Sequence, residues 1–356
     1  MAEAATGAYE VTAELPGMYE KILEVKVVNG SLTIGVATLA LMIALAALLT
    51  APIARAQDYP NHPITLIVPS PPGGGTDTQA RILAPKLTEL LGQPVVIENR
   101  PGATGNIGAQ AVAKAAPDGY TLLALISSHV MNPFVLKSVP YDIDHSFAMI
   151  SRTVTAPGVL VGNTSLPAKN LRELIALMRA NPGKITFGSA GVGSLSHLVV
   201  ELFEQQAGVK LLHVPYRGTE PALNDVLGGQ VGVMIPDLTI ALSNIKAGNV
   251  QAYGVTSLAR SPVAQDIPTL AEAGLPGFEA VQWFGVCAPA GTPGPILDKL
   301  FAAVTKALAD QNVKKQYEEL AMMPAPSTST QDYAKFVHDE GVRWGRVVAE
   351  AHIVAQ

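Results

Sequence analysis

Two glycine-rich turns hold the residues of this chain that are best suited to bind an anion. One covers residues 68–77 (VPSPPGGGTD), and the other covers residues 188–194 (GSAGVGS). Backbone N–H groups can gather around an anion at such turns, and the helix that follows adds partial positive charge at its N-terminus. A single turn of this kind is explained better as a plain strand–helix connection. The presence of two such turns strengthens the prediction of an anion site.

Other kinds of chemistry fit these residues less well. Residues 188–194 lack the lysine that a phosphate-binding P-loop needs, and they miss the Gly-x-Ser-x-Gly nucleophile elbow by one position. Ser194, His197 and Asp237 can be combined into a catalytic triad, but nothing in the sequence shows that their side chains converge. The His and Glu spacing predicts no zinc site, and the single cysteine, Cys287, rules out a disulfide within the chain.

Apolar runs alternate with helical patterns around these turns. Strands are predicted at 64–68, 94–98, 120–126, 159–161, 185–187, 231–235 and 252–256. Leucines at helical spacing follow both glycine turns. This alternation predicts an α/β protein whose parallel sheets are covered on both faces. Ligands bind at the carboxyl ends of strands in such sheets, and Ser70, Ser127 and Ser128 fall there.

Composition excludes several function classes. The chain has 356 residues, of which 48% are hydrophobic and 15% are charged, and its net charge is −5. This balance predicts a globular protein of one or two domains. No basic block is present, so the sequence predicts no nucleic-acid surface.

Residues 1–56 are predicted to be an export segment. Leu32 to Leu49 is continuously apolar or small, Ala54-Arg55-Ala56 is a small-x-small cleavage site, and Gln57 would begin the mature chain. The flank before the apolar run is acidic, so a start at Met18 would give a more ordinary leader. An uncleaved anchor is the alternative. Both interpretations place the rest of the chain outside the cytoplasm.

The sequence resembles the periplasmic receptors of tripartite tricarboxylate transporters, also called Bug proteins. The matching stretches keep their order and spacing from about residue 58 to residue 354, and they lie at 69–77, 98–108, 116–120, 189–194, 214–218, 227–231, 245–248, 268–274 and 288–293.

The resemblance implies a two-lobed periplasmic-binding-protein fold of type II, the Venus flytrap, with two parallel or mixed sheets, flanking helices and a hinge. Domain I is expected at 57–157 plus 283–356, and domain II at 158–282. The resemblance further implies a monomeric periplasmic protein that has no catalysis, cofactor or metal, captures a small carboxylate, and presents it to membrane permease subunits.

The carboxylate is expected between the two glycine turns. The full set of expected ligand-binding residues lies in these turns or at strand ends: Ser70, Pro72, Gly73, Gly74, Gly75, Asp77, Ser127, Ser128, Ala190, Gly191, Gly193, Ser194, His197, Tyr216, Arg217, Gly218 and Asp237. Ser70 stands where the family often carries an aromatic residue, so one wall of the pocket is expected to be smaller or more polar. Asp237 either faces the ligand or caps the following helix.

Two alternative functions remain at this point. One is a periplasmic serine hydrolase that uses Ser194 and His197, and the other is a ligand-sensing subunit for a signalling kinase. The sequence does not name the ligand, and citrate-like acids, dicarboxylates, amino acids and aromatic carboxylates all remain open.

Overall fold

The structure is a computed structural model that describes residues 9–10, 24–28, 31–33 and 59–354. The chain divides into two units, Met1–Asp58 and Tyr59–Gln356. In the first unit, β1 (Tyr9–Glu10), β2 (Glu24–Val28) and β3 (Ser31–Thr33) form an antiparallel sheet. Residues 34–58, with most of the predicted apolar run and the cleavage site, lie outside the described residues. Across the described residues, no helix is both long and apolar enough to cross a membrane.

The second unit contains a six-stranded mixed sheet, which with its helices is called lobe I. The strand order is β14-β7-β13-β6-β4-β5. Its strands are β4 (Ile64–Val68), β5 (Val95–Asn99), β6 (Thr121–Ile126), β7 (Phe147–Pro157), β13 (Val281–Pro289) and β14 (Met323–Pro324). As predicted, β4 is parallel to β5 and β6. The long crossing strand β13 instead runs antiparallel to β6 and β7, which makes the sheet mixed.

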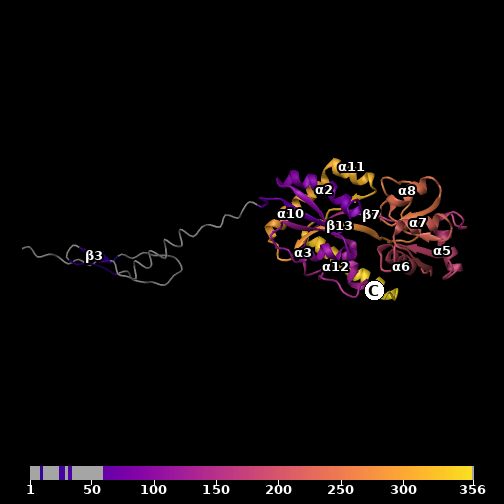
Figure 1. The fold of residues 1–356 in the computed structure, drawn as a ribbon, viewed down its shortest axis with the longest axis horizontal. Helices are drawn as coiled ribbons and strands as arrows, with labels where there is room; N and C mark the ends of the chain where they lie inside the picture. Colours follow the sequence, from indigo (N-terminus) through magenta and orange to yellow (C-terminus); the bar gives the residue numbers. More distant parts are fainter. Residues whose placement is uncertain (1–8, 11–23, 29–30, 34–58, 355–356) are drawn as a thin grey trace, which may run out of the picture. The chain divides into compact units, whose positions relative to one another are not determined.

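Helices cover both faces of the lobe I sheet, because apolar residues point alternately to each side. Ile64, Leu66 and Val68 of β4 pack in one cluster, whereas Ile67 belongs to the opposite one. The first face is covered by α2 (Gly75–Leu91), α10 (Gly294–Ala309) and α11 (Gln311–Glu319). The second is covered by α3 (Asn106–Ala113), α4 (Ser127–Val135) and α12 (Thr330–Glu350), with a short turn η1 (Ala103–Gly105) before α3. Figure 1 shows that lobe I combines indigo and yellow segments from both ends of the sequence.

A five-stranded mixed sheet with its helices forms lobe II. The order is β10-β9-β11-β8-β12, from β8 (Val159–Asn163), β9 (Thr186–Ser189), β10 (Leu212–Pro215), β11 (Val233–Met234) and β12 (Val250–Val255). One face is covered by α5 (Leu171–Ala180), α6 (Leu195–Ala207) and α9 (Leu270–Ala273). The other is covered by α7 (Thr219–Leu227) and α8 (Leu238–Lys246).

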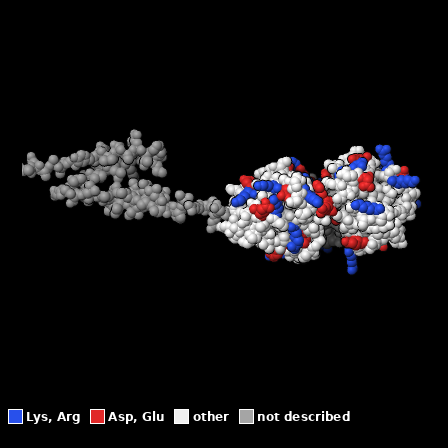
Figure 2. Space-filling model, turned by 90° about the horizontal axis from the view of Figure 1, so that it is seen from above, with Lys and Arg blue, Asp and Glu red and all other residues white. Residues whose placement is uncertain are grey.

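Two chain segments and two helices connect the lobes. The chain enters lobe II between β7 and β8, at Gly158, and returns at the start of β13. The C-terminal residues of α4 and α12, including Val135, Trp344 and Val348, pack into the main apolar cluster of lobe II. Figure 2 shows a groove between the two lobes, with acidic and basic side chains scattered over this face rather than gathered by sign.

Candidate functional site

The first glycine turn joins β4 to α2 and is closed by its own aspartate. Asp77 lies in the first turn of α2 and is 2% exposed. Its Oδ2 accepts hydrogen bonds from Gly73 N (2.9 Å) and Arg81 Nε (2.8 Å), and its Oδ1 accepts one from Asn99 Nδ2 (2.8 Å). Burial alone would raise the pKa of Asp77, but these donors and the charge of Arg81 outweigh it and lower that pKa to about 2. The carboxylate therefore stays charged and holds the turn in shape.

Free backbone donors remain at the start of α2. The N-cap residue, Gly74, has extended geometry and offers no side chain to the helix. Within the described part of the chain, no acceptor faces the N–H groups of Gly74, Gly75 or Thr76. The first N–H groups of a helix lack partners inside the helix and carry partial positive charge. This turn can therefore donate several hydrogen bonds to an anion.

The second glycine turn joins β9 to α6 and has more internal hydrogen bonds. Ser194 is the N-cap of α6: its Oγ accepts from His197 N (3.3 Å) and donates to Gly191 O (2.7 Å). Ser196 Oγ accepts from Ala190 N (2.9 Å), and His197 Nδ1 accepts from Gly193 N (3.1 Å). The N–H groups of Val192, Leu195 and Ser196 have no acceptor among the described residues.

Two stacked histidines support the second turn from behind. The rings of His197 and His213 are parallel, with centroids 4.0 Å apart, and Phe187 stacks on His213 at 4.5 Å. His213 Nε2 lies 2.6 Å from Ser189 Oγ, and His197 Nε2 lies 3.4 Å from Glu201 Oε1. Burial, followed by the charge of His197, lowers the pKa of His213 to about 4. His197 is thus a buried support of the turn in this structure.

A cavity of 160 Å³ lies beside the second turn, where the chain passes between the lobes. Three of the predicted residues line it: Ala190, Ser194 and Asp237. The other lining residues are Gly158, Leu195, Ser196, Val199, Thr219, Ile235, Pro236, Ala280 and Gln282. No residue of the first glycine turn is among them, so this cavity is bordered by the second turn alone.

Asp237 is a solvent-accessible carboxylate at this cavity. It is the N-cap of α8, yet its side chain makes no capping hydrogen bond. Nearby protein atoms remove part of its hydration, and the negative charge of Glu220 adds to this effect, so the pKa of Asp237 is raised. The sequence left two roles open for Asp237, contact with the ligand or capping of α8. In the structure its side chain does not cap α8, and the residue lines the cavity.

The remaining predicted residues lie at the edges of this region. Ser70 Oγ and Ser127 Oγ are buried without a hydrogen-bond partner, at the carboxyl ends of the neighbouring strands β4 and β6. Tyr216 donates its hydroxyl hydrogen to Asp225 Oδ2 (2.5 Å), and burial together with Asp225 raises the pKa of Tyr216 to about 12. Arg217 is exposed. The three other members of the set, Pro72, Ser128 and Gly218, line none of the cavities described here.

Comparisons with known proteins identify the family of this chain. The family model described as "Tripartite tricarboxylate transporter family receptor" (TctC) matches residues 79–353. This chain belongs to that family. Protein BugT of Bordetella pertussis (strain Tohama I) is 40% identical over 304 residues, which are 85% of this chain and 93% of BugT. The structure of the periplasmic binding protein BugD is 36% identical, covers 84% of this chain and 100% of its own, and has a TM-score of 0.67.

A third relative was solved with a small acid. The structure of R. palustris Rpa4515 with adipate is 36% identical, covers 84% of this chain and 100% of its own, and has a TM-score of 0.71. The TctC family consists of solute-binding proteins rather than enzymes, and the predicted periplasmic-binding-protein fold is confirmed. The serine-hydrolase alternative also fails on geometry, because His197 turns its ring nitrogens to Gly193 N and Glu201 rather than to Ser194 Oγ.

The sequence does not predict several residues that shape the candidate site. Ser196 was overlooked, although it is a second serine in the first turn of α6 and orients Ala190. Gln282 was overlooked as a polar residue inside an apolar crossing strand, and it lines the cavity. His213 carried no signal, because its contact with His197 forms only when β10 pairs with β9.

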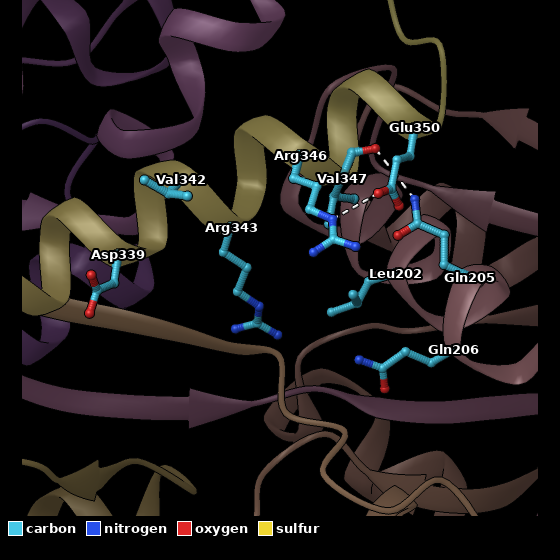
Figure 3. Close-up of a pocket in the computed structure, with 9 residues that line it drawn as sticks. All are labelled: Leu202, Gln205, Gln206, Asp339, Val342, Arg343, Arg346, Val347 and Glu350. Carbon is cyan, nitrogen blue, oxygen red and sulfur yellow. Dashed lines mark hydrogen bonds and ion pairs between the residues drawn. The ribbon is translucent and has the colours of Figure 1, made fainter.

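A larger groove lies away from both glycine turns. It measures 630 Å³ and runs between α6 and α12. Figure 3 shows Arg343 and Arg346 on α12 opposite Gln205 and Gln206 on α6, with Arg346 paired to Glu350 at 2.8 Å. Since the groove contains no predicted ligand-binding residue, its size does not make it the better candidate site.

Proposed function

We propose that this receptor captures a small carboxylate between its two lobes and presents it to the membrane permease subunits of a tripartite tricarboxylate transporter. One observation carries the proposal. Each lobe has a glycine turn that leads into a helix, and each turn keeps backbone N–H groups without an internal acceptor. Two such turns can hold a carboxylate without a salt bridge. The relative whose structure was solved with adipate supports this ligand class.

The lobes are proposed to close on the ligand as two rigid bodies. Domain I would comprise 57–157 plus 283–356, and domain II would comprise 158–282. Sheet membership supports these bounds, because the six-stranded sheet draws on the first two ranges and the five-stranded sheet on the third. The two crossings would act as the hinge. We further propose that residues 1–56 direct export and that the mature protein is a periplasmic monomer.

A proline placed at the start of α2 tests the donor role directly. Gly75 is the first residue of the helix, where proline is well tolerated, and Gly74 before it already has the extended geometry that proline requires. A side chain at Gly75 would meet only ordinary contacts, at 3.8 Å or more. Gly75→Pro therefore deletes one N–H donor and should leave the fold intact. Gly75→Ala keeps the donor and is the matched control.

Calorimetric titration of the receptor with a panel of small carboxylates, adipate included, gives the readout. One hydrogen bond to a charged group corresponds to about tenfold or more in affinity. We expect Gly75→Pro to weaken binding by that factor and Gly75→Ala to leave it nearly unchanged. The same comparison can be made at the start of α6, with Leu195→Pro as the test and Leu195→Ala as its control. Ser194, which precedes this position, also has the extended backbone geometry that proline requires. Unchanged affinity in both proline variants would exclude the two turns as the anion site.

A further inference from the structure

The cavity beside the second glycine turn presents opposite polarities on its walls. Leu195 and Ser196 line it, and their N–H groups lack an internal acceptor. Asp237 lines it as well, and its carboxylate has no helix cap and no ion pair within the described chain. Hydrogen-bond donors and an anionic acceptor therefore border the same small space.

The negative charge of Asp237 at this cavity is not balanced by a basic lining residue. None of the described lining residues is a lysine or arginine. Glu220, in the first turn of α7, adds a second negative charge that acts on Asp237. Ser194 Oγ donates to Gly191 O, and Ser196 Oγ accepts from Ala190 N and lies 3.1 Å from Ser194 Oγ; both hydroxyls are neutral, so they do not balance the charge of Asp237. An ionised carboxylate only accepts hydrogen bonds, and an ammonium group supplies both donors and the compensating charge.

We propose that this cavity selects a zwitterion: the carboxylate of an amino acid lies at the N–H groups of Leu195 and Ser196, and its ammonium group faces Asp237. The inference rests on the proposed carboxylate-binding function and narrows it to amino-carboxylates. The two charged groups of an α-amino acid are joined through one carbon, and the N–H donors and the Asp237 acceptor both line one cavity of 160 Å³. Asp237 is thus a specificity-determining residue.

Matched acids that differ only at the second carbon test the proposal. The panel contains aspartate, malate and succinate; glutamate, 2-hydroxyglutarate and glutarate; and alanine, lactate and propionate. We expect at least one amino acid to bind about tenfold or more tightly than the corresponding unsubstituted acid. Asp237→Asn should abolish that preference, and a urea unfolding midpoint equal to that of the wild type shows that the variant is folded. Glu220→Gln should reduce the preference less, and Asp298→Asn, an exposed aspartate of α10, should retain it.

The outcomes separate this inference from the proposed function. Binding of adipate or another acid without any amino-acid preference would overturn the zwitterion and leave the carboxylate receptor standing. A preference that survives in Asp237→Asn would also overturn it. If no carboxylate binds the wild-type receptor, both proposals fail.

Discussion

Asp77 closes the first glycine turn on itself, and its charge should be measurable as stability at low pH. The donors that surround it hold its pKa at about 2, below its ordinary 3.8. The unfolded chain then binds a proton between these values while the folded chain does not. The stabilisation is present above pH 3.8 and is lost as the pH falls towards 2. Asp77→Asn should lower the free energy of unfolding by about 1.5–3 kcal/mol at pH 7, because it removes a charged acceptor.

Urea unfolding at pH 7 and pH 3 measures this effect. The difference between wild type and Asp77→Asn should shrink at the lower pH, because at pH 3 the Asp77 carboxyl of the unfolded chain is protonated while that of the folded chain is not. Asp298→Asn is the control, because Asp298 is exposed on α10. A difference that is the same at both pH values would show that the charge of Asp77 does not contribute.

The sequence located this turn but not the direction of its side chains. Glycine, proline and aspartate mark a turn through local backbone preferences, which need no tertiary information. Whether Asp77 faces a ligand or Gly73 N depends on Arg81 and on Asn99 of a neighbouring strand. Likewise, the sequence places His197 on the polar side of the helix after the second turn and predicts it to bind the ligand, whereas in the structure its side chain is buried. Its burial depends on stacking with His213, which is distant in sequence.

At the scale of elements, the second glycine turn is packed against α4 of the other lobe. Gly193 has a φ of +75°, and a Cβ there would lie 3.0 Å from Val135 Cβ. Gly193→Ala should therefore cost about 1–2 kcal/mol from backbone strain, and further energy from the contact. Gly183 has a similar φ of +70° with open space around it, so Gly183→Ala should lose stability through backbone strain alone.

Chemical denaturation of four proteins separates these costs: the two single alanine variants, Val135→Ala, and the double variant Gly193→Ala/Val135→Ala. The double variant should lose less stability than the sum of its single changes, because removing the valine side chain relieves the contact. Strict additivity would mean that Gly193 and Val135 do not touch in solution.

Elements with a clear apolar period were predictable, and those with polar interruptions were not. Strands β4, β6 and β9 and the helices after the two turns were located from their patterns. Strand β7 was missed because Ser151, Arg152 and Thr153 interrupt its apolar run. In the fold, Ser151 Oγ accepts from Ser327 N and Thr153 Oγ1 donates to Gln79 Oε1, so these polar groups have partners that are distant in the sequence.

At the scale of the molecule, one buried glutamate ties the return crossing to the helix that joins both lobes. Glu340 of α12 accepts the indole N–H groups of Trp283 and Trp344, each at 3.0 Å. Arg343 bonds to Glu340 at 3.1 Å and also donates to Glu279 O, which precedes the crossing. Glu340→Ala leaves two buried indole donors unpaired and should cost about 2–5 kcal/mol in urea unfolding.

Asp339→Ala is the matched control for that prediction. Asp339 neighbours Glu340 on α12 but pairs with Lys335 at the surface, so its loss should cost less than about 1 kcal/mol. Equal losses in the two variants would contradict a structural role for the indole network. This network joins residues more than fifty positions apart, which explains why the sequence alone gave no sign of it.

Stability of the whole receptor should fall as the pH drops from 6.5 to 4. Burial lowers the pKa of both His129 and His213 from 6.5 to about 4. His129 Nδ1 accepts from Ile126 N at 3.3 Å, and its Nε2 lies 3.2 Å from Gly105 O, an arrangement that suits the neutral ring. Between these pH values the unfolded chain binds protons that the folded chain excludes, so unfolding becomes easier as the pH falls.

Urea unfolding midpoints at pH 7.5, 6.5, 5.5 and 4.5 should show this loss of stability. The double variant His129→Gln/His213→Gln should reduce the dependence of the midpoint on pH. The control His62→Gln, at an exposed histidine, should leave that dependence unchanged. An unchanged slope in the double variant would mean that other groups govern the acid sensitivity of the fold.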